Sequence, residues 1–167
     1  MLDLFALLLG APDGGSLPVL RYLADDHPWL EPAVAELAGV SLEQWQAEHT
    51  RLFVNGYPKT PCVPFESHFR HGRMGGAACR ELSQLYAGAG VAPTDELPPD
   101  YLGTMLSFAA WLQRDGGPAY QPFLEELEQT HLSRWLPEFC SALIANAHLE
   151  LYRLLGEKLQ NALDYRQ

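Results

Sequence analysis

Residues that could bind a metal gather between positions 66 and 71. Glu66, His68 and His71 supply one carboxylate and two imidazoles, which are ligand types that zinc accepts, and the two histidines are three residues apart. A zinc site needs three or four protein ligands, and no second cluster in the sequence supplies the others at a recognisable spacing. We therefore expect no metal site here and assign these side chains to the surface or to anchoring a loop.

The same stretch contains the residue types of a hydrolase, namely Glu66, Ser67 and His68. Neighbours in sequence rarely meet in the geometry of a catalytic triad, and no strand-to-helix nucleophile elbow precedes the serine. We expect Ser67 to cap a helix, so that its replacement by alanine would cost about 1 kcal/mol of stability. Residues 72–76 lack the spacing and the preceding strand of a phosphate-binding loop. These patterns favour a protein that is not an enzyme and holds no cofactor.

Composition and charge narrow the class of protein further. A chain of 167 residues with 47% hydrophobic residues has the size and apolar content of one domain, here residues 1–167. Its 21 acidic residues against 11 lysines and arginines give a net charge of −10, which repels nucleic acid and favours a basic partner. We therefore expect no binding of nucleic acid.

The distribution of cysteines and apolar residues predicts a cytoplasmic protein. Cys62, Cys79 and Cys140 are too far apart for a metal-binding or redox-active pair, so reduced thiols are expected. The apolar run from Leu4 to Leu9 is too short to span a membrane and lacks the layout of an export signal. We expect no stable insertion into a membrane.

The elements that must position these residues are predicted to be helices. Apolar residues recur at helical spacing throughout, and no segment alternates with period two, so we predict an all-α, single-domain bundle of about seven or eight helices. Ser41 and Gln44 form a capping-box pattern, and Asp100 is a candidate N-cap for its own helix. Prolines 58, 61 and 64 predict a long loop from Asn55 to Glu66. The expected helices cover residues 2–9, 16–23, 28–39, 41–55, 76–87, 100–113, 123–131 and 137–163.

Several stretches taken in order resemble one known family. Glu48, three further residues and the pair Leu52-Phe53, followed by a loop and residues 64–67 (Pro-Phe-Glu-Ser), resemble the signature of the TorD/DmsD/NarJ family of redox-enzyme maturation chaperones. Residues 97–102 (Leu-Pro-Pro-Asp-Tyr-Leu) are similar to a second stretch of that family. The likeness extends to the helix of residues 108–112 and to His131-Leu132 with Trp135 and Phe139, so that it spans roughly residues 40–160. The chain departs from the family pattern in two places: the family often has an aromatic residue where this chain has His49, and an Asp-His pair where this chain has Asp100-Tyr101.

The resemblance implies an all-α chaperone without catalytic activity. Its partner would be the catalytic subunit of a molybdenum-containing redox enzyme, bound through an N-terminal twin-arginine leader or the remnant of one until the cofactor is inserted. The resemblance also implies a monomer or a domain-swapped dimer. One alternative is an assembly chaperone, similar to NarJ, for a molybdoenzyme that is not exported, and a second is a small helical metal-dependent hydrolase that uses Glu66 to His71.

A receptor for such a leader needs acidic groups beside an apolar groove, because the leader is basic at one end and apolar beyond it. We expect apolar residues around Leu52 and Phe53 to form the groove, and Glu66 and Asp100 to face the basic end. The predicted peptide-binding residues are His49, Leu52, Phe53, Tyr57, Pro64, Phe65, Glu66, Ser67, Asp100 and Tyr101.

Overall fold

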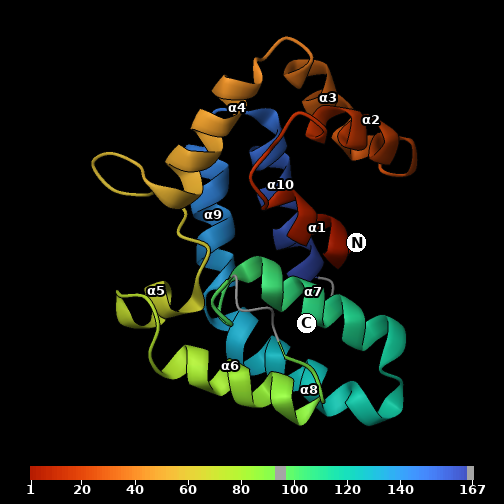
Figure 1. Ribbon diagram of the computed structural model, residues 1–167, viewed down its shortest axis with the longest axis vertical. Coiled ribbons are helices and arrows are strands. Elements are labelled where there is room, and N and C mark those ends of the chain that lie inside the picture. Colours follow the sequence, from red (N-terminus) through yellow and green to blue (C-terminus); the bar gives the residue numbers. More distant parts are fainter. Residues whose placement is uncertain (93–96, 165–167) are drawn as a thin grey trace. The chain divides into compact units, whose positions relative to one another are not determined.

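A computed structural model describes residues 1–92 and 97–164 and confirms the all-helical fold class (Figure 1). The described ranges contain ten α-helices, more than the seven or eight expected. The helices are α1 (Leu2–Leu8), α2 (Ser16–Asp26), α3 (Glu31–Leu37), α4 (Leu42–His49), α5 (Glu66–His71), α6 (Ala77–Gly88), α7 (Leu102–Asp115), α8 (Gln121–Glu126), α9 (Leu136–Asn146) and α10 (Glu150–Asp164). Short 3₁₀ turns are η1 (Pro28–Leu30), η3 (Pro118–Tyr120) and η5 (Leu132–Arg134), and π-helical turns are η2 (Thr50–Val54) and η4 (Leu127–His131).

The chain divides into two units, each formed by two separate segments. Unit 1 contains Met1–Gly10 and Pro64–Pro137, and unit 2 contains Ala11–Val63 and Glu138–Gln167. The first unit therefore consists mainly of α1 and α5 to α8, and the second of α2 to α4 with most of α9 and all of α10. One domain over residues 1–167 stays a prediction.

Unit 1 is built around the contact between α1 and α7. The buried face of α1 is formed by Leu4, Phe5 and Leu8, which confirms the helical spacing seen in the sequence. On α7, Phe108 meets Tyr86 of α6 edge to face, with ring centroids 4.7 Å apart. Burial of each large apolar side chain contributes about 1.5–3 kcal/mol, so each of these contacts stabilises the unit.

Unit 2 has an aromatic core shared by α4, η2, α9 and α10. Phe53 stacks on Phe139 at 6.4 Å and meets Tyr152 edge to face at 5.3 Å. The indole of Trp45 donates a hydrogen bond to the Tyr152 hydroxyl at 3.0 Å, which satisfies a buried polar pair inside the core. Gly156 lets α9 and α10 approach closely, because a Cβ there would lie 2.9 Å from Ile144.

The long helix predicted for residues 137–163 is wrong, because the chain breaks between α9 and α10. The break has no local glycine or proline, and carboxylates from distant helices hold it instead. Glu48 accepts a hydrogen bond from the backbone N–H of His148 at 2.7 Å, and Glu36 accepts one from the N–H of Glu150 at 2.6 Å. These acceptors satisfy amides at the start of α10 that an uninterrupted helix would have bonded internally. The helix predicted for residues 123–131 is present, as α8 continued without a break by the π-helical turn η4.

Two further local signals are confirmed. Ser41 and Gln44 form the predicted capping box at the start of α4, with both reciprocal hydrogen bonds present. Residues 55–65 form the predicted loop, which connects the π-helical turn η2 at the end of α4 to α5. Gly56 is required in that loop, since a Cβ there would lie only 2.6 Å from the carbonyl oxygen of Arg51.

Candidate functional site

Two predicted motifs, residues 64–67 and residues 97–102, meet in unit 1. Phe65 and Tyr101 form an antiparallel bridge. The N–H of Leu102 donates to the carbonyl of Pro64 at 2.9 Å, and the N–H of Glu66 donates to the carbonyl of Asp100 at 3.1 Å. Sequence reasoning placed both motifs in one site without showing how they meet, and the backbone hydrogen bonds supply that link.

The carboxylate of Asp100 caps α5 rather than its own helix. It is fully buried, and its Oδ2 atom accepts a hydrogen bond from the N–H of Ser67 at 2.9 Å, in the first turn of α5. A carboxylate at this position satisfies a helix donor and favours the positive end of the helix dipole. The prediction that Asp100 caps α7 is wrong, because Tyr101 occupies that N-cap position and no side chain caps the helix there.

A thiol occupies the other oxygen of Asp100. The Sγ atom of Cys79 in α6 lies 3.0 Å from Oδ1, where the thiol can donate a hydrogen bond to the carboxylate. Burial, followed by this bond to Asp100, raises the pKa of the Cys79 thiol to about 11. The protonated thiol therefore ties α6 to the cap of α5 at neutral pH.

The prediction that Ser67 caps a helix is also wrong. Phe65 occupies the N-cap position of α5, and the hydroxyl of Ser67 accepts a hydrogen bond from the N–H of Gly75 at 2.9 Å. Ser67 is fully buried, so this bond anchors the turn between α5 and α6 to the interior of the unit. The serine contributes to the turn that follows the helix, whereas the cap comes from Asp100.

Glu66 lies at the centre of a chain of charged groups. Its side chain is fully buried, one carboxylate oxygen is 2.8 Å from Nη1 of Arg70, and the other is 2.9 Å from Nδ1 of His131. The same nitrogen of Arg70 also contacts Glu81 at 2.7 Å, and Glu81 is 43% exposed. A buried carboxylate must be compensated by such partners, because removal from water is costly for a charge.

The burial of Glu66 and Asp100 bears on their predicted contact with a basic peptide. Both side chains have no exposed surface in this structure and both have internal partners. A direct contact between either carboxylate and a ligand would therefore require a rearrangement of the pairing described above. Peptide binding by these residues stays a prediction.

The aromatic side chains of the bridge are more accessible. Phe65 and Tyr101 are each partly exposed, and their ring centroids are 5.5 Å apart. The Tyr101 hydroxyl donates to the carbonyl of Leu9 at 3.2 Å, and the ring lies against Gly103, where a Cβ would be 2.4 Å from it. Burial raises the pKa of the Tyr101 hydroxyl to about 12, so it stays protonated. Pro64, beside Phe65, is buried.

The other four predicted residues belong to unit 2 and differ in exposure. His49, Leu52 and Phe53 are buried, with His49 and Phe53 in edge contact at 5.1 Å. The carbonyl of Leu52 accepts a hydrogen bond from the N–H of Cys62, which anchors the end of the loop. Tyr57 is 98% exposed in the same loop. The first three residues therefore form part of a core, and Tyr57 is open to solvent.

Glu48 was singled out by its place in the motif, but its role could not be predicted. It is 7% exposed and binds Arg51 through two hydrogen bonds of 2.8 and 2.9 Å, in addition to the amide of His148. Burial alone would raise the pKa of Glu48, but the bonds from Arg51 and His148 together lower it below its ordinary value. The residue joins α4 to the break before α10, and no local signal identifies those partners.

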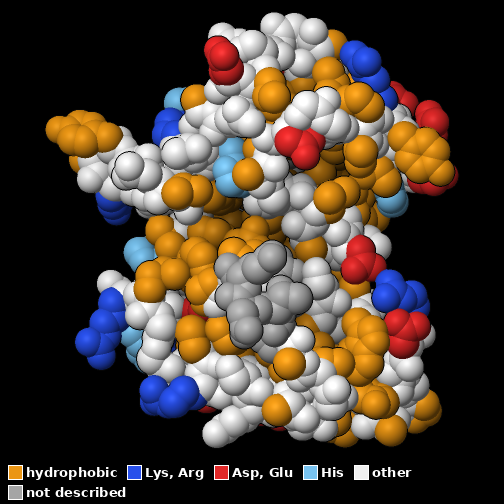
Figure 2. All heavy atoms as spheres, viewed as in Figure 1, with side chains coloured by type: hydrophobic (Ala, Val, Ile, Leu, Met, Phe, Trp, Pro, Cys, Tyr) orange, Lys and Arg blue, Asp and Glu red, His pale blue; other side chains and the backbone are white. Residues whose placement is uncertain are grey.

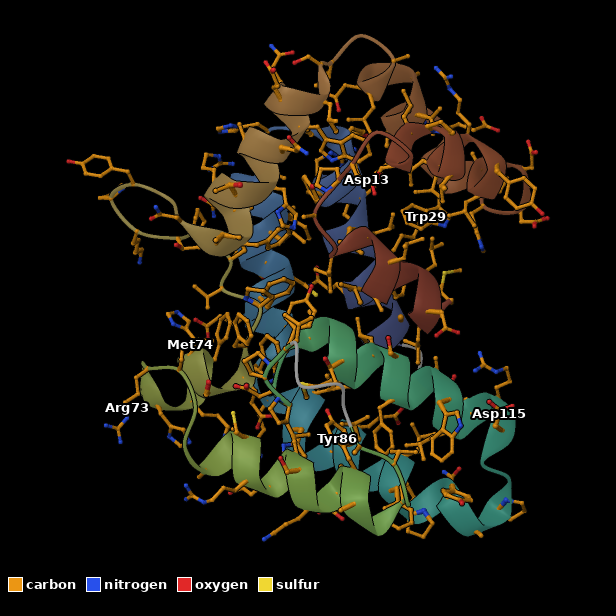
Figure 3. The ribbon with its side chains drawn as sticks, viewed as in Figure 1. Asp13, Trp29, Arg73, Met74, Tyr86 and Asp115 are labelled. Carbon is orange, nitrogen blue, oxygen red and sulfur yellow. The ribbon has the colours of Figure 1, made fainter. Side chains whose placement is uncertain are left out.

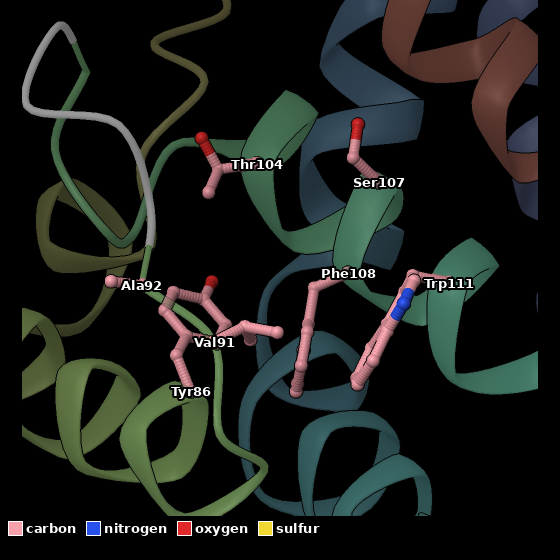
Figure 4. A pocket seen from close by; sticks show the side chains of 7 residues that line it. All are labelled: Tyr86, Val91, Ala92, Thr104, Ser107, Phe108 and Trp111. Atoms are coloured by element: carbon pink, nitrogen blue, oxygen red, sulfur yellow. The ribbon is translucent and has the colours of Figure 1, made fainter. Parts of the chain in front are cut away.

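Unit 1 also contains an open pocket of about 230 Å³ (Figure 4). Its walls are mainly aromatic and aliphatic, and two hydroxyl groups, those of Thr104 and Ser107, lie on one side of it. The lining residues are Tyr86, Val91, Ala92, Thr104, Ser107, Phe108 and Trp111. Such a lining suits an apolar group and offers no charged side chain for catalysis.

The candidate metal cluster is not assembled. Glu66 faces His131 and Arg70, whereas His71 is exposed at the end of α5. Over residues 1–92 and 97–164, no three histidine, cysteine or acidic side chains are arranged to hold a metal ion. The three cysteines in these ranges are free thiols.

A family model described as nitrate reductase delta subunit matches residues 21–141, which is most of the chain. The chain belongs to the nitrate reductase delta subunit family. The match includes both motifs of the Phe65–Tyr101 bridge, together with Glu48 and His131. The likeness to the TorD/DmsD/NarJ chaperones seen in the sequence is thereby confirmed.

A solved structure agrees with this family assignment. A candidate redox enzyme maturation protein from Archaeoglobus fulgidus is 25% identical to this chain and superposes with a TM-score of 0.73. The alignment covers 98% of this chain and 91% of the other. The family and this relative together indicate a redox enzyme maturation chaperone, which is not a catalytic class of protein. Among the described helices of this family member, none has the length and apolar character needed to cross a membrane.

Proposed function

We propose that this protein is a cytoplasmic chaperone for the catalytic subunit of a molybdenum-containing redox enzyme. It would bind the N-terminal leader of that subunit, a twin-arginine signal or its remnant, and hold it while the cofactor is inserted and before export. Family membership supports the chaperone role. The observation that carries the leader-binding role is the bridge that presents Phe65 and Tyr101 as a partly exposed aromatic pair.

Aromatic rings suit both parts of a twin-arginine leader. The apolar part of the leader binds favourably when it buries its surface against the rings. A guanidinium group can stack over a ring face and contribute about 0.5–2 kcal/mol of binding free energy. Exposed ion pairs contribute about 0.2–1 kcal/mol each, whereas micromolar affinity needs roughly 8 kcal/mol. Burial of apolar surface against Phe65 and Tyr101 therefore has to supply most of the affinity.

The buried carboxylates have a positioning role in this proposal. Asp100 holds the start of α5 and Glu66 holds that helix to His131, so both fix the backbone that carries Phe65. Ser67 and Pro64 support the same segment through the α5–α6 turn and the hydrogen bond to Leu102. In unit 2, the buried residues His49, Leu52 and Phe53 support the loop that carries Tyr57. Of these four side chains, only that of Tyr57 is open to a ligand.

The test begins with purification of the protein with its partners from its native cytoplasm, followed by mass spectrometry. The N-terminal peptide of the best candidate is then titrated with wild type, Phe65→Ala and Tyr101→Leu. We expect saturable binding to wild type and at least tenfold weaker binding to both variants, since about 1.4 kcal/mol of contact is lost. Tyr22→Ala is the matched control, because Tyr22 is an aromatic side chain that is 74% exposed in unit 2.

The result can contradict the proposal in two ways. Binding that is unchanged in both variants, with folding verified by circular dichroism, would remove the aromatic pair from the site. A partner that binds equally well after deletion of its N-terminus would exclude leader recognition. A molybdoenzyme partner whose N-terminus lacks paired arginines would instead identify a chaperone for an enzyme that is not exported.

A further inference from the structure

The turn between α5 and α6 carries a positive surface on an otherwise acidic chain. Between Glu66 and Glu81 the sequence has three arginines, two histidines and no acidic residue, although acidic residues outnumber lysines and arginines by 21 to 11 overall. Figure 2 shows blue side chains over α5 and α6, among others elsewhere on this face, and Figure 3 shows Arg73 extending from this turn away from the helices. We call the exposed residues of this region the arginine surface: His71, Arg73, Arg80 and Arg134.

The ion pairs of the chain explain why this surface keeps its charge. Four arginines of the described ranges are paired with carboxylates, namely Arg51, Arg70, Arg114 and Arg153. By contrast, Arg73, Arg80 and Arg134 form no ion pair with any described carboxylate.

Two acidic groups of this region, Glu66 and Glu81, already have partners. Glu66 is buried between Arg70 and His131, and Glu81 binds Arg70 at 2.7 Å. The pKa of Glu81 is lowered, first by its hydrogen bond to Arg70 and also by the charges of His131 and Arg134. The charge of Arg134 therefore reaches the same carboxylate. Three guanidinium groups remain for a ligand.

We propose that the arginine surface binds a short acidic segment of a partner protein. Guanidinium groups match carboxylates in pairs of parallel hydrogen bonds, so the chemistry of the surface fits aspartate or glutamate side chains. Met74, which is 50% exposed in the same turn, adds an adaptable apolar contact that favours a peptide over a free anion. The occupant is a segment with several acidic residues and at least one apolar residue.

Charge separates this occupant from the other ligands. A basic leader would be repelled by the arginine surface. The acidic segment therefore binds independently of the leader and carries the opposite charge. A long polyanion or an anionic membrane would extend beyond the arginine surface and meet the remainder of a chain with a net charge of −10. At physiological salt, charges are screened beyond about 8 Å, so a short segment placed on the arginines senses mainly these groups.

The test uses the full chain and a fluorescein-labelled, glutamate-rich peptide that contains two leucines. Fluorescence anisotropy should show saturable binding that weakens as salt rises from about 0.05 to about 0.3 M, and a peptide with glutamine in place of glutamate should not bind. The double variant Arg73→Glu/Arg80→Glu should bind about tenfold more weakly. The matched control is Arg21→Glu/Lys59→Glu, which makes the same change of charge at exposed residues of unit 2 and should bind as wild type does.

Both arginines are exposed, so the double variant should fold, and Arg73→Gln/Arg80→Gln provides a second variant without charge reversal. The proposal is overturned by absence of saturable binding, by equal binding of the glutamine peptide, or by an equal loss in the Arg21/Lys59 control. Binding to phosphatidylglycerol vesicles or duplex DNA in place of the peptide would also overturn it. The variants at Arg73 and Arg80 should still bind a leader peptide, so failure here and failure of the proposed function are separate results.

Discussion

Replacing Glu66 by glutamine tests whether this carboxylate supports the fold. The substitution preserves the shape of the side chain but removes its charge. It also replaces one of the two carboxylate oxygens, which lie 2.8 Å from Nη1 of Arg70 and 2.9 Å from Nδ1 of His131, by an amide NH₂ that cannot accept a hydrogen bond. Removal of one partner from a buried ion pair costs about 3–5 kcal/mol, and single hydrogen bonds to charged groups contribute about 1.5–3 kcal/mol.

The expected loss of unfolding free energy is near the lower end of the range for a broken buried ion pair, about 3–5 kcal/mol. Arg70 keeps its contact with Glu81 and is itself 18% exposed, so its charge is only partly uncompensated after the change. We expect Glu66→Gln to lower the free energy of unfolding by about 3 kcal/mol, or the melting temperature by roughly 6–12 °C for a chain of this size. Urea denaturation followed by far-ultraviolet circular dichroism measures this directly.

Glu81→Gln is the control, because it removes the exposed partner of the same arginine and should cost less than about 1 kcal/mol. A cost below about 1 kcal/mol for Glu66→Gln, or a cost equal to that of Glu81→Gln, would refute the structural role of the buried carboxylate. The same experiment decides how peptide binding by Glu66→Gln should be interpreted. A loss of affinity in a destabilised variant would report on the position of Phe65 rather than on a direct charge contact.

Further substitutions test other packing and charge contacts. Gly103→Ala should cost about 1–3 kcal/mol in thermal unfolding, because the new Cβ would lie 2.4 Å from the Tyr101 ring; an unchanged midpoint would show that the ring can move freely. Gly56→Ala should destabilise the protein by a similar amount, about 1–3 kcal/mol, while Gly14→Ala, where nothing lies within 4 Å, should not; equal effects would contradict the close approach in the loop. Because the pKa of Glu48 is lowered in the folded state, its stabilisation is complete above its ordinary value of 4.5 and is lost as pH falls through the lower folded value. The difference in unfolding free energy between wild type and Glu48→Gln should therefore shrink as the pH is reduced from neutral to acid, and a difference that stays constant would contradict this linkage.

The fold could be predicted from the sequence where its signals are local. Helical spacing and the Ser41–Gln44 capping box depend on residues within one helix, and these predictions are confirmed. The break before α10 could not be predicted, since its amides are satisfied by Glu36 and Glu48, which are far away in sequence. Local rules therefore extended one helix through a break that distant carboxylates stabilise.

The candidate site shows the same limit for capping. Sequence rules assigned Ser67 and Asp100 to the helices that they adjoin, whereas Asp100 caps α5 and Ser67 anchors the next turn. The family resemblance named His131 without a role, and the structure gives it Glu66 as a partner. Buried or exposed side chains near a loop look alike in a sequence, so the burial of Glu66 and Asp100 could be learned only from the structure.

The division of each unit into two chain segments affects how the protein can be made on a ribosome. In unit 1, α1 packs on α7, so α1 lacks this contact until residues 102–115 have been synthesised. Unit 2 likewise lacks α9 and α10 until the last part of the chain emerges. Contacts between segments so distant in sequence slow folding and leave apolar faces open during synthesis. Nascent chains that end before α7 should therefore be sensitive to protease along α1, and the order of synthesis delays completion of both units until most of the polypeptide is present.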